Sequence, residues 1–365
     1  MANYATHTPY LLTACNHNGK KKSAGFTLYS IPDKVEFEFD EPFLHEKLFI
    51  GSQYGWLMVL DQHCEPSLLN PLTGESIMLP SITTLPTVRP CHSISGDIVS
   101  YFYRYSTIRQ DFHFLDYTFD HYLRQVTFIK VVVSCNPSLV SSNNFVVAAL
   151  VGYGSRLVVA RPGESRWNLL QEKQWYIDIM FRQNGKLLCL TNFGALHEVE
   201  FNDAGDDFVI TEISPQFLKE NGRFKLYLAE DCAGRVLTIL RKYNFIFFPE
   251  TDQVKLFRLI VGNNINRSEE SKWEQVKDLG GQAIFVGTNA SFTLAKHEIH
   301  GEIKEDTVYF TDEWWDYATG DEARSWPRDI CAYNLTNNSI KPCCPNKHQQ
   351  CTWPLPVWIH LSNSI

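Results

Sequence analysis

The chain has 365 residues, of which 44% are apolar, 20% charged and 13% aromatic, and its formal net charge is −8. This composition excludes a disordered chain, and the acidic balance argues against nucleic-acid binding, because phosphate contacts need a concentrated excess of Lys and Arg. No apolar stretch approaches the roughly 18 residues of a membrane span, and the N-terminus has no apolar signal core. We therefore expect an unsecreted protein of the cytoplasm and/or nucleus that makes no membrane contact.

Strand signals follow one another along nearly the whole sequence. Short apolar runs are separated by Gly, Pro, Asn or Asp, which predicts β-strands joined by tight turns. The runs fall into groups of three or four strands. We expect these groups at about residues 9–40, 48–80, 127–171, 176–214, 224–278 and 282–343. The better helical candidate, 215–221, is about two turns at most.

A four-stranded unit that repeats about every 50 residues is typical of a β-propeller, because a single blade cannot bury both of its faces. We predict an all-β fold in one domain, 1–365, with a core at about 9–361 and six four-stranded blades. The last run, 357–361, has no blade of its own, and we expect it to join the N-terminal blade and close the ring. The segment 81–126 is then a long excursion, with a seventh blade as the alternative.

Several of these stretches resemble a known family in the same order. They are GSQYGWLMVLD with LLNPLTGESIMLP, VVARPGESRWNLL, GGQAIFVGTNASFTL, TVYFTDEW with DICAYNL, and WPLPVWIHL. The chain resembles the plant F-box/kelch-like proteins that carry the domain of unknown function 295. This resemblance covers nearly the whole sequence, from about Pro9 to Leu361.

The resemblance implies a KIB-type β-propeller, which in many relatives follows an F-box. The F-box binds the Skp adaptor of a cullin ubiquitin ligase, and the propeller selects the protein to be ubiquitinated; some relatives recognise a GSK3-like kinase. Here the first predicted strand begins at about residue 9, which leaves no room for an F-box. The chain is a propeller-only relative or a piece of a longer product, and ligase membership is not carried over from the resemblance.

The sequence has no motif of an enzyme or cofactor site. A Gly-rich turn feeding a helix, a G-x-S-x-G elbow, an H-E-x-x-H pair and a kinase signature are all missing from it. The cysteines form no C-x-x-C pair, and Cys343, Cys344, His348 and Cys351 suit tetrahedral zinc poorly because the first two are adjacent. We expect the protein to bind no metal and no cofactor, and to have no enzymatic activity. A site assembled around the channel from several blades would be scattered in the sequence, so a channel-centred enzyme or small-ligand binder is the alternative.

Two features offer candidate protein-binding residues. In RLVVARPGESRW, Arg156, Arg161 and Arg166 could offer guanidinium groups to a carboxylate or phosphate. The alternative is a structural salt bridge within the blade, to Glu164 or Asp178.

The second feature is the stretch DEWWDYATGDEARSW, 312–326, which we call the insertion because it separates two strands of the last blade. Aromatic side chains in a polar loop are typical of interaction hot spots, although they could also fold back as a lid. With the excursion, the insertion predicts a protein-binding face. Its candidate residues are Trp314, Trp315, Asp316, Tyr317 and Trp326, with Tyr103 and Tyr105 from the excursion.

Protein recognition is therefore the function that the sequence predicts, with a partner that it does not identify. The propeller would act as a substrate receptor, or as a competitor that occupies a ligase target without delivering it to the Skp adaptor.

Overall fold

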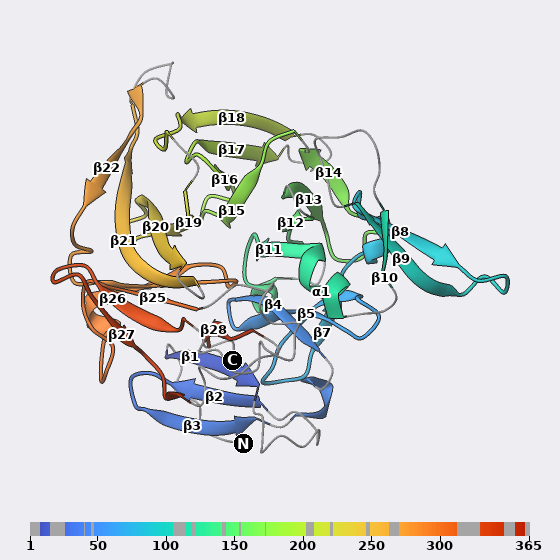
Figure 1. Ribbon diagram of the computed structural model, residues 1–365, viewed down its shortest axis with the longest axis horizontal. Coiled ribbons are helices and arrows are strands. Elements are labelled where there is room, and N and C mark those ends of the chain that lie inside the picture. Colours follow the sequence, from blue (N-terminus) through green and yellow to red (C-terminus); the bar gives the residue numbers. More distant parts are fainter. Residues whose placement is uncertain are drawn as a thin grey trace.

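The computed structural model describes residues 8–14, 26–39, 41–44, 47–104, 114–117, 121–140, 144–152, 155–171, 173–201, 208–219, 222–245, 249–262, 270–311, 329–346 and 355–361. Across these residues the strands form seven sheets, and six of the sheets stand as blades around a central axis (Figure 1). The protein is an all-β, six-bladed propeller, as the repeat predicts.

The first three blades follow the chain in order and each contains four strands. Blade 1 contains β28 (Val357–His360), β1 (Pro9–Ala14), β2 (Phe26–Ser30) and β3 (Val35–Phe39); blade 2 contains β4 (Leu48–Gln53), β5 (Trp56–Leu60), β6 (Pro66–Leu69) and β7 (Ser76–Met78); blade 3 contains β11 (Phe128–Val133), β12 (Val147–Val151), β13 (Arg156–Ala160) and β14 (Asn168–Gln171).

The other three blades complete the ring. Blade 4 contains β15 (Tyr176–Phe181), β16 (Leu187–Thr191), β17 (Leu196–Phe201) and β18 (Phe208–Ser214); blade 5 contains β19 (Phe224–Glu230), β20 (Val236–Phe245), β21 (Pro249–Ile260) and β22 (Lys272–Val276); blade 6 contains β24 (Phe292–Leu294), β23 (Ala283–Val286), β25 (Thr307–Phe310), β26 (Cys331–Asn334) and β27 (Ser339–Pro342).

Blade 6 departs from the predicted four strands because it has five. Its extra strand, β24, returns antiparallel along β23 at the inner edge of the sheet. The chain then crosses over, so that β25 pairs parallel to β23. The connection between β23 and β24 therefore lies toward the propeller axis.

Burial falls from the axis of the propeller to its rim. The runs VAALV of β12 and LLCLT of β16 are buried at every position, whereas β7 and β22 at the outer edges alternate between exposed and half-buried positions. Inner strands bury both faces against the adjacent blades, which explains why they read as continuous apolar runs.

The ring closes as the sequence predicts, through the C-terminal strand. β28 pairs antiparallel with β1, from Pro9 opposite His360 to Leu12 opposite Val357. Because the two ends of the propeller share one sheet, blade 1 cannot open without breaking these backbone hydrogen bonds.

The excursion is not a seventh blade. It forms a three-stranded sheet of β8 (Val88–His92), β9 (Ile98–Arg104) and β10 (Phe114–Tyr117), which projects from the ring in Figure 1. Blades 2 and 3 contact each other directly at the axis, where the Gln53 side chain donates to Val133 O (3.1 Å) and accepts from Val133 N (2.8 Å). No space remains between them for another blade.

The α-helix α1 (His121–Thr127) ends the excursion. The segments η1 (Pro42–Leu44), η2 (Ile82–Thr84), η3 (Pro137–Leu139) and η4 (Lys296–Glu298) are single 3₁₀ turns. The predicted helix at 215–221 does not form over its described part, 215–219. Phe217 instead packs on Phe257 and Trp273, with ring centroids 4.8 and 5.6 Å away. None of the helices the structure describes is long and apolar enough to cross a bilayer.

Candidate functional site

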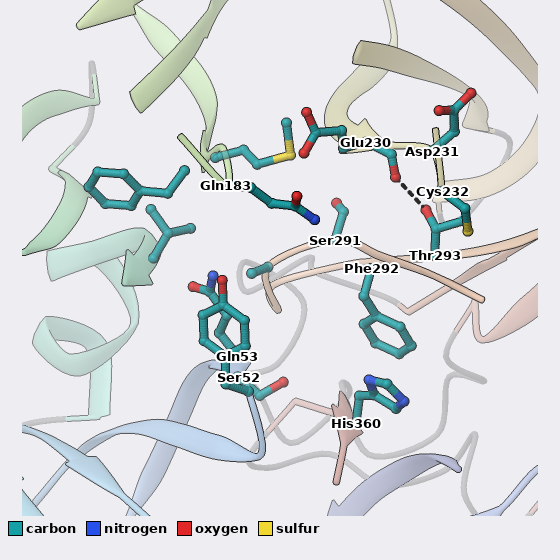
Figure 2. A pocket seen from close by; sticks show the side chains of 15 residues that line it. Ser52, Gln53, Gln183, Glu230, Asp231, Cys232, Ser291, Phe292, Thr293 and His360 are labelled. Atoms are coloured by element: carbon teal, nitrogen blue, oxygen red, sulfur yellow. Dashed lines mark hydrogen bonds between the residues drawn. The ribbon is translucent and has the colours of Figure 1, made fainter. Parts of the chain in front are cut away.

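The innermost strands of the blades run in the same direction, and their ends meet at one opening of the central channel, which we call the channel mouth. A cavity of about 300 Å³ lies there. Every blade contributes to its lining: the six innermost strands supply Gln53, Val132, Phe181, Glu230, Phe292 and His360. Figure 2 shows Gln53, Glu230, Phe292 and His360 around a common space. The channel mouth is thus a place where all six blades can contact the same ligand.

Residues 287–290, which we call the plug, cross the channel beneath this cavity. The segment leaves blade 6 after β23 and reaches blades 2 and 3 on the other side of the axis. Lys130 Nζ donates to Gly287 O (3.0 Å) and Asn289 O (2.6 Å), and Ala290 N donates to Ser52 O (2.9 Å). The plug also lies against Gly51, where a Cβ atom would be 2.9 Å from Thr288 O. Glycine at position 51 therefore permits the close approach.

A buried ion pair supports the plug from below. Lys130 Nζ lies 3.2 Å from Asp178 Oδ1, and the two side chains are 5% and 3% exposed. Asp178 also accepts from the backbone N–H groups of Ile179 (2.9 Å) and Leu228 (2.7 Å). Burial raises the pKa of Asp178, while Lys130 lowers it. Since its partners come from blades 3, 4 and 5, this carboxylate ties the inner strands together.

The acidic side chains of the channel mouth have partners of their own. Glu230 Oε1 accepts from Arg182 Nε (2.8 Å), and no described residue donates to Glu230 Oε2. Asp231 accepts from Ala233 N, Arg235 N and Arg235 Nε in the turn after β19. Glu230 therefore keeps one carboxylate oxygen for a ligand, whereas Asp231 is occupied by the turn.

Tyr54 stands at the rim of the mouth in a strained backbone conformation. Its φ of 53° is in the left-handed region, and the residue is 39% exposed. Tyr54 and Gly55 (φ 80°) form the two-residue turn between β4 and β5, and such a turn needs a positive φ at both positions. A bulky residue in this conformation costs of order 1 kcal/mol. Leu139, 75% exposed in η3 just after β11, adds an apolar group at the same end of the blades. The rim therefore presents an exposed aromatic and an exposed apolar side chain to the solvent.

A column of stacked rings runs from the mouth into blade 6. The centroids of His360 and Phe292 are 5.0 Å apart, those of Phe292 and Phe285 are 4.8 Å apart, and those of Phe285 and Tyr309 are 4.6 Å apart. Trp358 meets Phe285 edge-on at 5.4 Å. Because both neighbours of Phe292 are stacked on it, the aromatic wall of the cavity is held in a fixed orientation.

The opposite face of the propeller carries both ends of the insertion. β25 runs away from the mouth, so that Thr311 and Asp329, the described residues that flank 312–328, lie at that face. The buried Arg241 joins them: its Nη1 donates to Thr311 O (2.7 Å) and its Nη2 to Asp329 Oδ2 (2.8 Å). Thr251 adds two bonds to the same carboxylate oxygen, from N (2.8 Å) and Oγ1 (2.6 Å). We call this group the Arg241 clamp.

Most of the candidate protein-binding residues predicted from the sequence are either buried or outside the described residues. Tyr103 is fully buried, and its hydroxyl donates to Val126 O (2.8 Å). Arg156 is also buried. Neither side chain is open to a partner, because both pack inside the fold. The other candidates, Tyr105, Trp314, Trp315, Asp316, Tyr317 and Trp326, lie outside the described residues.

Arg161 makes the salt bridge that was the alternative to ligand binding. Its Nη1 lies 3.7 Å from Glu164 Oε1, and its backbone N donates to Glu164 Oε2 (3.0 Å). The other suggested partner, Asp178, pairs with Lys130 instead.

No group of three or more described His, Cys, Asp or Glu side chains is arranged to hold a metal ion. Cys343 and Cys344 are free thiols, and burial raises the pKa of Cys343. His348 and Cys351, the other two residues that the sequence analysis judged a poor zinc site, lie outside the described residues.

Comparisons with known proteins give relatives and a family. Three F-box proteins of Arabidopsis thaliana are similar to this chain. One is 25% identical over 177 residues, which cover 47% of this chain and 43% of that protein. The second is 21% identical over 331 residues (84% and 75%), and the third is 23% identical over 281 residues (72% and 74%). The chain thus spans less than half the length of the first relative.

Solved structures show only weak similarity. A protein from Lactobacillus plantarum matches with a TM-score of 0.38 at 9% identity, over 97% of this chain and all of that one. The Swd1 β-propeller domain of Myceliophteria thermophila matches with a TM-score of 0.35 at 10% identity, over 93% and 97%. Scores this low carry no argument about function.

The family model described as the KIB1-4 beta-propeller matches residues 28–334. This range includes strands of all six blades, the plug and most of the channel mouth. The chain therefore belongs to the KIB1-4 β-propeller family.

Proposed function

We propose that this chain is a protein-recognition module and that its partner binds over the channel mouth. The observation that carries the proposal is the cavity to which every blade contributes, with the strained and exposed Tyr54 at its rim. Exposed aromatic anchors around a concave site are typical of interaction hot spots. The F-box proteins among the relatives support the proposal, because the resemblance to the F-box/kelch-like family implies a propeller that selects other proteins.

A non-catalytic role fits the chemistry of the channel. Lys130 and Asp178 are saturated by each other and by backbone groups, and Asp231 is held in its turn. A general acid or base must be able to reach a substrate proton, which these groups cannot do. The alternative is that the propeller binds a small ligand. A panel of metabolites tests it by thermal shift, because only a compound that binds the native state raises the midpoint of thermal unfolding.

Two roles are compatible with protein recognition. As a substrate receptor, the propeller would present its partner to a ubiquitin ligase, and the Skp adaptor would co-purify with it. As a competitor, it would hold the same partner without the adaptor. The resemblance to the F-box/kelch-like proteins makes a GSK3-like kinase a candidate partner, and co-purification distinguishes the two roles for whichever partner is found.

The insertion provides a second candidate surface on the opposite face. The excursion also starts and ends there, because β7 ends and β11 begins on that side. Thr311 and Asp329, the described residues that flank the insertion, therefore lie on the same side as the two ends of the excursion. We keep the sequence-based proposal that Trp314 and Trp315 contact a protein.

The test is an affinity measurement with the captured partner. Tagged protein is used for capture from the native tissue, the partner is identified by mass spectrometry, and the purified partner is titrated against variants. Tyr54→Asn removes the rim aromatic and keeps a residue that tolerates the left-handed conformation. We expect this change to weaken binding by at least about 2 kcal/mol, roughly thirtyfold in Kd.

Met78→Ala is the matched control, because Met78 is an exposed apolar residue on the outer edge of the same blade. Trp314→Ala with Trp315→Ala tests the opposite face in the same titration. Unchanged affinity in Tyr54→Asn, with the loss confined to the double tryptophan variant, would move the binding surface to the opposite face. Unchanged affinity in both would refute both surfaces.

A further inference from the structure

The lining of the channel mouth has an uneven charge. It contains two carboxylates, Glu230 and Asp231, and neither Lys nor Arg is among its lining residues. Glu230 Oε2 accepts no hydrogen bond from the described residues, and its side chain is 18% exposed. In Figure 2 the Glu230 carboxylate lies near Gln183 at the edge of the cavity. A ligand that reaches this wall meets a hydrogen-bond acceptor with negative charge.

The other wall is aromatic. His360 is stacked on Phe292 with their planes 8° apart, and Tyr54 stands exposed at the rim. Because Phe285 covers the other face of Phe292, the rings that can offer a face to a ligand are those of His360 and Tyr54. Aromatic faces attract ammonium and guanidinium groups, and guanidinium also stacks on them. Met180 and Val132 complete the lining with apolar surface, which suits the methylene stem of a long side chain.

One polar atom inside the cavity lacks a partner. Ser291 Oγ is buried and makes no hydrogen bond with any described residue. Such an atom costs about 1–3 kcal/mol unless a ligand or a water satisfies it. The hydroxyl can accept a hydrogen bond.

We propose that the channel mouth receives a cationic side chain, arginine or lysine, of the protein partner. This inference rests on the proposed function and specifies what the partner inserts. The ammonium or guanidinium group lies between Glu230 and the aromatic wall, and its stem lies on the apolar lining. An acidic side chain offers no donor to Glu230 Oε2, and a neutral one lacks the charge that strengthens the bond to Glu230. The cavity volume of about 300 Å³ is at the lower end for ligand sites, which fits one side chain.

The experiment uses capped pentapeptides, acetyl-Gly-Gly-X-Gly-Gly-amide, with arginine, lysine, citrulline or glutamate at X. Citrulline has nearly the shape of arginine without its charge. Binding to the full chain is measured by NMR titration at low salt. We expect the arginine and lysine peptides to bind at one site, the citrulline peptide about tenfold more weakly, and the glutamate peptide not at all.

Glu230→Gln should weaken binding of the arginine peptide about tenfold and reduce its salt dependence. Glu198→Gln is the matched control: it removes the same charge from a carboxylate that also has an ion-pair partner, Lys186 at 2.9 Å, but lies outside the mouth. Equal binding of citrulline and arginine, no binding of the arginine peptide, or equal effects of the two glutamine variants would overturn the inference.

The outcomes also separate this inference from the proposed function. If Tyr54→Asn weakens partner binding but the arginine peptide does not bind, the partner binds at the mouth. In that case the inference that it inserts a cationic side chain is wrong. If the peptide binds as expected but Tyr54→Asn leaves the partner's affinity unchanged, the mouth is a cation site that the partner does not use.

Discussion

Replacing Lys130 with Met tests the account of the channel interior. Lys130 Nζ contacts Asp178 and two plug carbonyls, Gly287 O and Asn289 O. Removing the cation leaves a buried carboxylate without its partner, which costs about 3–5 kcal/mol. The two carbonyls also lose a donor at about 1 kcal/mol each, so we expect the upper part of that range.

A second substitution separates the unpaired charge from the lost packing. Lys130→Met combined with Asp178→Asn removes both charges and keeps an acceptor for Leu228 N. We expect this double variant to lose only about 1–3 kcal/mol, so that it is more stable than the single variant. Urea unfolding followed by tryptophan fluorescence gives the free energies of unfolding. A single-variant loss below about 1 kcal/mol, or a double variant no more stable than the single one, would refute the reasoning.

The pH dependence of the single variant has a definite sign. Burial raises the pKa of Asp178, and without Lys130 that pKa rises further above the unfolded value of about 3.9. The folded state then binds the proton more tightly than the unfolded state. The free energy of unfolding therefore falls as the pH rises from about 4 through the raised pKa. We expect the stability gap between wild type and Lys130→Met to be larger at pH 8 than at pH 5.

Three further predictions follow from the contacts. Gly51→Ala should cost about 1–3 kcal/mol in urea unfolding, because the added methyl group meets Thr288 O at 2.9 Å; an unchanged midpoint would show that the plug moves freely. Arg241→Met should cost about 3–5 kcal/mol by the same assay, since it leaves Asp329 without its cation, and adding Asp329→Asn should recover part of the loss. Tyr54→Asn should raise the thermal midpoint by the equivalent of about 0.5–1 kcal/mol, because it relieves a left-handed tyrosine; a lowered midpoint contradicts the strain.

The blades could be read from the sequence because their turns are punctuated by residues that turns require. In blade 2, Asn70 accepts from Leu72 N and Thr73 N, and Gly74 has a φ of 75°. Such local chemistry marks each strand end without reference to distant contacts. The ring closure was also predictable, since the C-terminal run had strand character and no other partner.

The channel mouth could not be read in the same way. Gln53, Phe181, Glu230 and His360 come from four blades, and only the closed ring brings them together. Each is the last residue of an apolar inner strand, and the signal in the sequence is this recurrence of polar or aromatic residues at successive strand ends. The burial of Tyr103 depends on the excursion packing against blades 2 and 3, which its aromatic sequence does not reveal.

The most direct test of protein recognition at the mouth is site-specific photo-crosslinking. A photo-reactive amino acid replaces Gln183, which is exposed beside the cavity, or Met78 on the outer edge of blade 2 as the control. Each protein is irradiated with the purified partner, and the crosslinked peptides are identified by mass spectrometry. We predict crosslinks from position 183 that excess arginine peptide suppresses, and none from position 78. Crosslinks of equal yield from both positions, or none from position 183 with a partner that still binds, would contradict the account.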